Sequence, residues 1–222
     1  MKVLRNFFGS TIGQKIVMAV TGVVLSLFVL AHMAGNLQAF LPNGAEALDH
    51  YGAFLRTLLH GTGIWFARAG LLVAVVLHVW AFLALFRKNR AARPVGYRKT
   101  SFYESTWASR TMKVTGPLLL VFIVYHLLHL TTGTVHPHFE EGRVYQNLVT
   151  GLQVVPVAIF YLLAMGALAF HLFHGTWSML QTLGASHPTF DLFRKRLAAV
   201  FTVVVVGGFA IVPIAVLMGW LR

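Results

Sequence analysis

Five long apolar stretches constrain the fold of this chain more than any other feature. They run approximately over residues 16–37, 64–86, 114–132, 152–180 and 197–221. Each is about 20 residues long or longer, which is the length that a helix needs to cross the hydrocarbon core of a bilayer. Charged residues make up only 11% of the sequence, whereas a soluble domain carries about 25%. The sequence therefore predicts an all-α integral membrane protein, a five-transmembrane-helix bundle that forms one domain over residues 1–222.

The segments between the apolar stretches are short and leave no room for a soluble domain. In residues 44–60, apolar side chains recur at helical spacing, which predicts a short amphipathic helix on the membrane surface. Pro117 and Pro156 are expected in the first turns of the third and fourth membrane helices, where the missing N–H costs little. The first stretch is too long for a cleavable signal, so we expect it to remain as a helix.

Basic residues concentrate on one side of the predicted membrane. The positive-inside rule then places the N-terminus in the cytoplasm and the C-terminus outside. This topology, together with anionic lipid head groups, explains the net charge of +12, so no nucleic-acid partner is expected. A second interpretation is that the segment 87–113 also docks a cytoplasmic partner protein. The predicted cytoplasmic side holds 14 of the 18 basic residues: Lys2, Arg5, Lys15, Arg87, Lys88, Arg90, Arg93, Arg98, Lys99, Arg110, Lys113, Arg194, Lys195 and Arg196.

Histidines inside the apolar stretches are the strongest functional signal. An ionisable side chain in a membrane helix usually faces the bundle interior and marks a functional site. The simpler alternative is that each histidine hydrogen-bonds a neighbouring helix. A shared role explains the set better, because four of the five stretches contain histidine. Six of the 11 histidines lie in the stretches: His32, His78, His126, His129, His171 and His174.

The depths of these histidines fall into two levels. With a rise of about 1.5 Å per residue from the basic side, His78 and His171 lie roughly 12 and 14 Å deep. His126, His129 and His32 lie at roughly 20, 24 and 25 Å. Two facing histidines at one level are what bis-imidazole ligation of a b-type haem requires. The sequence therefore predicts an inner pair from the second and fourth helices and an outer pair from the first and third.

Depth alone does not choose the ligand within each doublet. His126 and His129 share a helix face, and so do His171 and His174. The other member of each doublet could bond a haem propionate, line a quinone pocket or bind nothing. The chain contains no cysteine, which excludes iron–sulfur clusters and thiolate ligation of haem on this chain. Glycines in or near the first four stretches would leave room for a flat cofactor, although close helix packing explains each equally well: Gly22, Gly35, Gly70, Gly116, Gly166 and Gly175.

Four segments combine histidines, glycines and apolar runs in a specific order. They are "GQKIVMAVTGVVLSLFVLAHMAGNL" at 13–37, "RAGLLVAVVLHVW" at 68–80, "KVTGPLLLVFIVYH" at 113–126 and "FHLFHGTWSMLQTLG" at 170–184. With these segments the sequence resembles the cytochrome b membrane-anchor subunit of succinate:quinone oxidoreductases, the succinate dehydrogenases and fumarate reductases, in its single-polypeptide dihaem form. The resemblance extends over nearly the whole chain.

The resemblance implies particular haem ligands. In that family the histidine that follows "V-T-G" and an apolar run in the third helix is a ligand, which here is His126. The fourth-helix ligand lies four residues before the glycine of a "G-x-W-S" segment, which here is His171. Two b haems are thus implied, with the axial pairs His78/His171 inside and His32/His126 outside. Haem propionate contacts are expected among Arg87, Arg110, Lys113, Arg68, His129 and His174.

The resemblance also implies the function and the partners. The chain would anchor a flavoprotein subunit and an iron–sulfur subunit on the cytoplasmic side of a bacterial inner membrane. It would pass electrons through two haems to a quinone, with menaquinone expected, and it would not oxidise succinate alone. The complex could form higher oligomers. Candidates for the quinone site are Glu46, Asp49, His50 and Tyr51, and an inner site near the second connection is the alternative.

Two other functions fit parts of the same pattern. A dihaem cytochrome b of a hydrogenase or a formate dehydrogenase would need the same histidine chemistry. A haem-free channel or transporter would share the five apolar stretches. Co-purification with a covalent-flavin polypeptide would favour the succinate:quinone oxidoreductase over the first alternative. A visible absorption spectrum would show whether haem is present and so distinguish the cytochrome from the second alternative.

Overall fold

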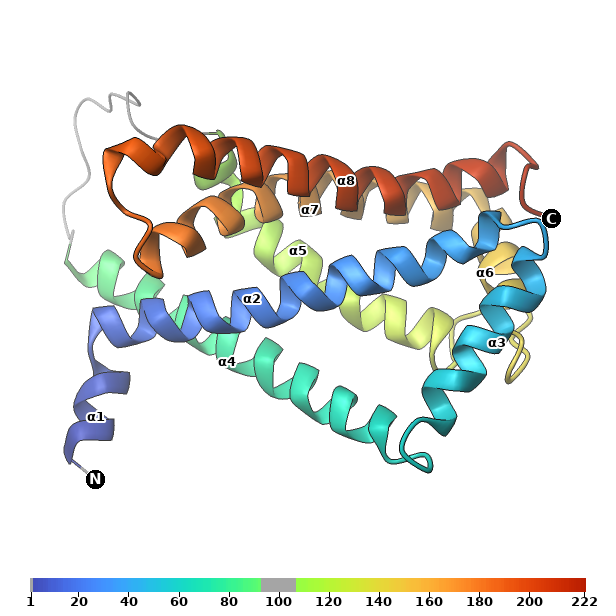
Figure 1. Ribbon diagram of the computed structural model, residues 1–222, viewed down its shortest axis with the longest axis horizontal. Coiled ribbons are helices and arrows are strands. Elements are labelled where there is room, and N and C mark those ends of the chain that lie inside the picture. The colour runs from blue at the N-terminus through green and yellow to red at the C-terminus, as the bar shows by residue number, and fades with distance from the viewer. Residues whose placement is uncertain (1, 93–106) are drawn as a thin grey trace.

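The computed structural model describes residues 2–92 and 107–222 (Figure 1). Among these residues, five helices are long and apolar enough to cross a membrane. The predicted all-α bundle of five membrane helices is confirmed. The predicted basic-side residues Arg93, Arg98 and Lys99 lie outside the described residues. In the described part of the chain all regular elements are helical: α1 (Lys2–Gly9), α2 (Thr11–Asn36), η1 (Leu37–Phe40), α3 (Gly44–Thr57), α4 (Gly63–Ala91), α5 (Trp107–Leu130), α6 (Val144–Gln153), α7 (Val155–Thr182), η2 (Pro188–Phe190) and α8 (Asp191–Leu217).

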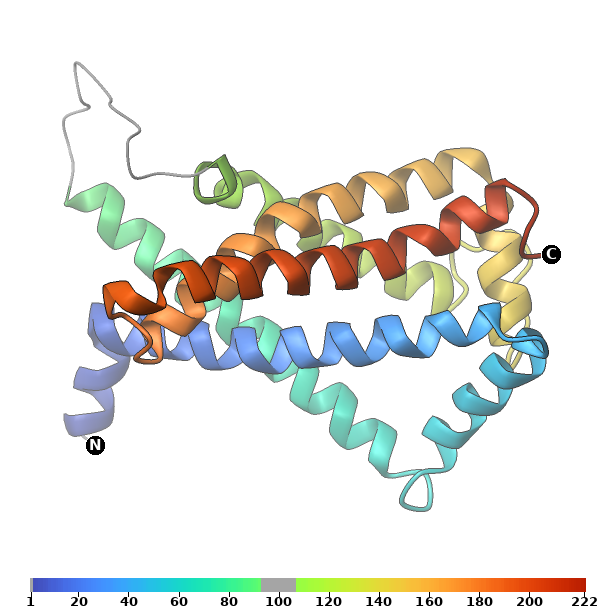
Figure 2. The same ribbon diagram turned by 45° about the horizontal axis from the view of Figure 1, so that its top comes forward.

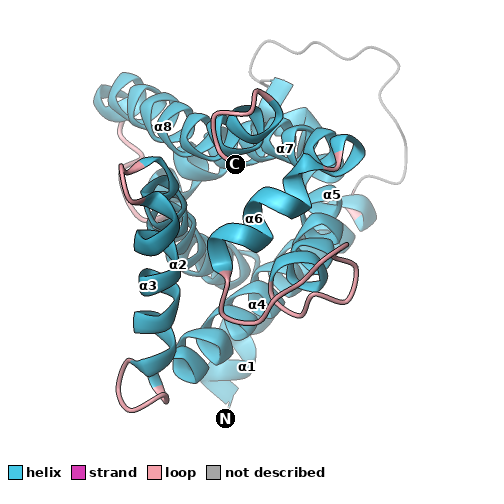
Figure 3. Ribbon diagram, turned by 90° about the vertical axis from the view of Figure 1, so that its right-hand side faces the viewer, coloured by secondary structure: helices cyan, strands magenta, loops and turns pink. Residues whose placement is uncertain are grey.

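The five long helices α2, α4, α5, α7 and α8 run alongside one another, and the termini lie at opposite ends of the bundle (Figures 1 and 2). We call one end of the bundle the capped end, because α3 and α6 lie across it; it also holds the C-terminus (Figure 3). The basic end holds α1, the end of α4, the start of α5 and the connection from α7 to α8 (Figure 1). Which end faces the cytoplasm stays a prediction. The elements of the basic end carry the described cations Lys2, Arg5, Lys15, Arg87, Lys88, Arg90, Arg110, Lys113, Arg194, Lys195 and Arg196.

Helix α7 is the centre of the bundle, because it packs against α2, α5 and α8. Ala158 and Ala164 of this helix are fully buried, and small side chains of this kind let membrane helices approach closely. Helix α2 packs against α4 as well as α7. Helices α2 and α4 come together toward the basic end and separate toward the capped end, where α3 connects them (Figures 1 and 2).

The helices begin where local sequence signals favour a start. Ser10 caps α2 by accepting a hydrogen bond of 2.9 Å from the backbone N–H of Gly13. Pro156 lies in the first turn of α7, as predicted. The prediction for Pro117 was wrong, because α5 begins at Trp107 and Pro117 lies inside it. Hydropathy marks where the apolar surface begins, and α5 begins earlier, in the polar sequence that precedes it.

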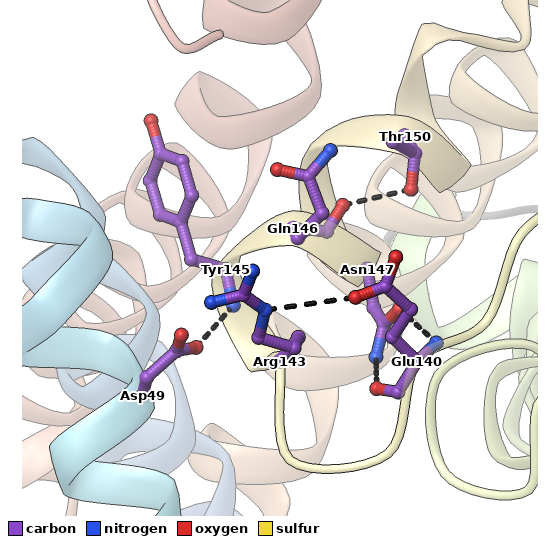
Figure 4. Close-up of polar contacts among 7 residues, drawn as sticks. All are labelled: Asp49, Glu140, Arg143, Tyr145, Gln146, Asn147 and Thr150. Carbon is purple, nitrogen blue, oxygen red and sulfur yellow. Dashed lines mark hydrogen bonds and ion pairs between the residues drawn. The ribbon is translucent and has the colours of Figure 1, made fainter.

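The loop of residues 131–143 closes the capped end and is fastened by one buried side chain, Asn147 (Figure 4). The Asn147 amide donates to the carbonyl oxygen of Glu140 at 2.7 Å and accepts from its N–H at 2.9 Å. The backbone carbonyl oxygen of Asn147 accepts from His136 Nε2 at 2.8 Å. Nearby, Asp49 Oδ1 accepts from the N–H of Tyr145 at 2.8 Å, which ties α3 to the start of α6. The cap is therefore held by polar bonds as well as by its apolar core.

Asn147→Ala is expected to loosen this loop. The substitution removes two hydrogen bonds to the backbone of Glu140, each of which contributes about 0.5–1.5 kcal/mol. Hydrogen exchange of residues 131–143 and the unfolding temperature in detergent measure the effect. Thr150→Ala is the matched control, because the Thr150 hydroxyl donates to Gln146 within the same helix at 2.7 Å. Equal exchange rates in the two variants would contradict the role given to Asn147.

Candidate functional site

The first candidate site lies between α4 and α7, where the structure brings His78 and His171 together. Their ring centres are 6.3 Å apart and the ring planes are inclined at 54°. Two imidazoles on opposite sides of one metal, with metal–nitrogen bonds of about 2 Å, have ring centres roughly 6 Å apart. The spacing of His78 and His171 therefore fits axial ligation of a single iron.

Two glycines border the His78–His171 pair. A Cβ atom built at Gly22 of α2 would lie 3.7 Å from His78 Cε1, and one built at Gly116 of α5 would lie 3.8 Å from His171 Cε1. A methyl group fits at these distances, whereas a longer side chain would occupy the space beside the imidazoles. The two glycines thus place no side chain of α2 or α5 against these imidazole carbons, which suits a flat cofactor.

Thr21 of α2 orients the His78 ring. Its Oγ1 lies 2.7 Å from the Val17 carbonyl oxygen and 3.1 Å from His78 Nδ1. The single hydroxyl proton is donated to the carbonyl, so the oxygen is left to accept from His78 Nδ1–H. In that tautomer the lone pair of His78 Nε2 is free for a metal. Sequence reasoning missed Thr21, because its partner lies 57 residues away on another helix.

The second candidate site lies nearer the capped end, between α2 and α5. The ring centres of His32 and His126 are 5.8 Å apart, with the planes inclined at 83°. His32 stacks on Phe28 at 5.5 Å and lies 5.6 Å from Phe209 of α8. The surroundings are aromatic and apolar, apart from the hydroxyl of Tyr161 at 3.2 Å from His126 Nδ1. This pair fits the same axial ligation.

The other member of each histidine doublet has different surroundings. His129 is fully buried, and its ring faces Tyr125, His136 and Tyr161. His174 packs against Trp177, and within the described residues its Nδ1 is buried without a hydrogen-bond partner. The part of the chain that the structure describes holds no group of three or more residues suited to a simple metal ion. The ring contacts bring His78 to His171 and His32 to His126, and two facing imidazoles are what bis-imidazole ligation of a haem requires.

The basic residues expected at haem propionates are spread over several positions. Arg87, Lys113 and Arg68 are exposed, and the Arg68 guanidinium lies 4.9 Å from the Trp65 ring centre. The Arg110 guanidinium lies 4.5 Å from the ring centre of Trp107, and Lys113 Nζ lies 5.6 Å from that of Phe86. The expected propionate contacts of these cations stay a prediction.

Arg194 of α8 is a buried cation that sequence reasoning did not single out. Its side chain is only 4% exposed, and its Nη2 forms an ion pair with Asp191 Oδ1 at 3.2 Å. In the described structure its Nε and Nη1 are buried without hydrogen-bond partners. A buried guanidinium with unpaired N–H groups is costly unless an anion meets it. The charge pattern of the sequence did not indicate this burial, because Arg194 and its exposed neighbour Arg196 belong to the same basic run.

The four residues proposed for a quinone site share helix α3 but have different surroundings. Asp49 accepts a hydrogen bond from the Tyr145 N–H (Figure 4), and Tyr51 packs on α2, where a Cβ at Gly35 would lie 2.7 Å from its ring. Glu46 and His50 are exposed and lie 3.9 Å apart. The structure thus brings the four onto one element, with only Glu46 and His50 open to solvent or lipid head groups.

Five long apolar helices define this chain as a multi-pass membrane protein, and facing histidine pairs lie between them. The sequence model of the succinate dehydrogenase/fumarate reductase transmembrane subunit family matches residues 87–212, which is more than half of the chain. The chain belongs to this family, as its resemblance implied, and is therefore a membrane subunit of a succinate dehydrogenase or fumarate reductase complex. His126 and His171 lie within the matched segment, whereas His32 and His78 precede it. No curated protein and no solved structure gives a significant match.

Proposed function

We propose that this chain is the dihaem anchor of a succinate:quinone oxidoreductase, with His78/His171 and His32/His126 as the axial pairs. The observation that carries the proposal is the presence of two imidazole pairs, 6.3 and 5.8 Å between ring centres, at two levels of one bundle. Two b haems, when bound, supply one-electron carriers between an iron–sulfur subunit and a quinone. The protein contributes the ligands and their orientation, and the surrounding apolar helices keep water away.

The ends of the bundle support the proposed partners. The basic end offers cations to an iron–sulfur subunit, which would in turn hold a flavoprotein subunit on the cytoplasmic side of a bacterial inner membrane. This chain has no cysteine ligands for clusters and would not oxidise succinate alone. We place a menaquinone site at the capped end, near Glu46 and His50. These two side chains are exposed, and they lie at the end of the bundle that is nearer the outer histidine pair.

Purification of the chain with its native partners tests this function against its closest alternative. A polypeptide with covalent flavin and an iron–sulfur protein are expected to co-purify in equal amounts with the chain. Co-purification of a hydrogenase or a formate dehydrogenase subunit instead would overturn the succinate assignment and leave the histidine chemistry unchanged.

We further propose that Arg194 meets a propionate of the inner haem. It lies next to Lys195, whose Nζ is 5.5 Å from the ring centre of Trp177. Trp177 follows His171 by six residues on α7, which is roughly 9 Å along the helix toward the basic end. A carboxylate reaching from the His171 level toward that end would satisfy the unpaired N–H groups of Arg194.

Arg194→Gln is expected to lower the midpoint potential of the inner haem, because a nearby positive charge favours the reduced state. For a separation of roughly 8 Å and an effective dielectric constant of about 20, a unit charge contributes about 2 kcal/mol, so we expect a decrease of tens of millivolts. Redox titration of the purified complex measures it. Exposed Arg196→Gln is the matched control, and an equal response of the two variants would argue against a propionate contact.

A further inference from the structure

One buried hydroxyl joins the two histidines of the outer doublet. Tyr161 of α7 is 8% exposed. Its Oη lies 3.2 Å from His126 Nδ1 and 2.9 Å from His129 Nδ1, both on α5. The tyrosine is held in place by Phe122, whose ring meets the Tyr161 ring edge-on at 5.0 Å. The hydroxyl is therefore fixed between two imidazoles on consecutive turns of one helix.

A tyrosine hydroxyl has a single proton, so Tyr161 can donate to only one of the two imidazoles, and a buried O–H needs such an acceptor. If Tyr161 donates to His129 Nδ1, its oxygen accepts from His126 Nδ1–H, and His126 Nε2 carries a free lone pair. If Tyr161 donates to His126, the directions are reversed, and the free Nε2 lone pair belongs to His129. The orientation of one hydroxyl thus decides which histidine of the doublet is able to ligate a metal.

The surroundings favour the first direction. His126 faces a second imidazole, that of His32. His129 is 0% exposed and is pressed against α6, since a Cβ at Gly151 would lie 2.7 Å from His129 Nε2 and 2.8 Å from His136 Nε2. His136 is itself engaged, because its Nε2 donates to the Asn147 carbonyl oxygen and its Nδ1 accepts from the N–H of His138. His129 Nε2 thus lies against Gly151 and His136, and in the described structure it is buried without a hydrogen-bond partner.

We propose that Tyr161 is a positioning residue that, by donating to His129, fixes His126 in the tautomer whose Nε2 binds the outer haem iron. His129 then serves as the buried acceptor that holds the Tyr161 hydroxyl, and it is not a ligand. Thr21 gives His78 an equivalent hydrogen bond at the inner pair. The inference rests on the proposed dihaem function and deepens it, because an N–H···O bond from an axial imidazole raises the basicity of the ligand.

Tyr161→Phe tests the inference on the whole purified complex. The phenyl ring preserves the packing and removes the hydroxyl, so we expect two haems per chain to remain. The midpoint potential of the outer haem should rise, because a less basic imidazole stabilises the oxidised iron less. The midpoint potential of the inner haem should be unchanged. Loss of the outer haem to an apoprotein acceptor should be roughly 10–100-fold faster. Tyr125→Phe is the matched control, since the Tyr125 ring stacks on His129 at 5.5 Å but has no hydrogen bond to either histidine in the described structure.

A pair of substitutions at His129 keeps the test decisive if Tyr161→Phe does not assemble. His129→Asn presents an amide oxygen close to the position of Nδ1 and should leave the outer potential near that of the unaltered protein. His129→Leu removes the acceptor and should shift the potential as Tyr161→Phe does. An unchanged midpoint potential of the outer haem in Tyr161→Phe or His129→Leu, with both haems bound, would overturn this inference and leave the proposed function standing. An unaltered complex without an outer haem would overturn the proposed function itself.

Discussion

Substitution of His171 by alanine is expected to reduce the haem content of the purified complex from two b haems per chain to about one. Alanine offers no ligand, and the partner imidazole of His78, 6.3 Å away, is left without its counterpart. His78→Ala should give the same loss, because both substitutions remove one side of the same axial pair. The remaining haem should keep the midpoint potential of the outer haem, which redox titration of the variant measures.

The outer pair allows a sharper comparison within one helix. His126→Ala should remove the outer haem and retain the inner one, and His32→Ala should do the same. His129→Ala should retain both haems, because His129 is turned toward His136 and Tyr161. Exposed His138→Ala is a neutral control. Retention of the outer haem in His126→Ala together with its loss in His129→Ala would show that the ligand of α5 is His129.

The second large effect concerns energy coupling. If electrons reach a quinone at the capped end, and this end faces the outside, they cross most of the bilayer. One elementary charge moved across the membrane changes the free energy by about 2.3 kcal/mol per 100 mV. Reduction of a low-potential quinone such as menaquinone by succinate is uphill, and inward proton uptake driven by the potential would offset it. An uncoupler should therefore depress succinate-driven quinone reduction in sealed vesicles severalfold.

The control for this experiment separates catalysis from coupling. Succinate oxidation by a soluble dye, which accepts electrons before they enter the membrane subunit, should proceed equally with and without uncoupler. Equal rates of quinone reduction under both conditions, in vesicles shown to hold a potential, would contradict the outer quinone site. That result would favour a quinone site at the basic end, near the inner histidine pair.

The features of the fold that follow from hydropathy were predictable from the sequence. The apolar stretches give the five membrane helices, because helix length and bilayer thickness are tied together. The start of α5 was not predictable in this way. Residues 107–113 precede the long apolar stretch but already belong to the helix, so Pro117 was wrongly expected near the first turn.

The candidate site was predictable only in outline. Depth along each helix predicts which helices share a level, since the rise per residue is fixed. Depth does not give the direction of a side chain, so it leaves His126 and His129 open. The hydroxyls of Thr21 and Tyr161 gave no sequence signal, because each bonds a histidine on another helix, 57 and 35 residues away. The burial of Arg194 depends in the same way on how α7 and α8 pack.

The pyridine haemochrome assay on the complex purified with its native partners tests the central proposal most directly, since it gives haem type and the number of haems per chain. With two imidazole pairs as ligands, the assay should find two b-type haems per chain, and redox titration should resolve two midpoint potentials. A chain without haem would contradict the proposal and favour a transporter or channel. One haem per chain would show that only one of the two histidine pairs binds iron.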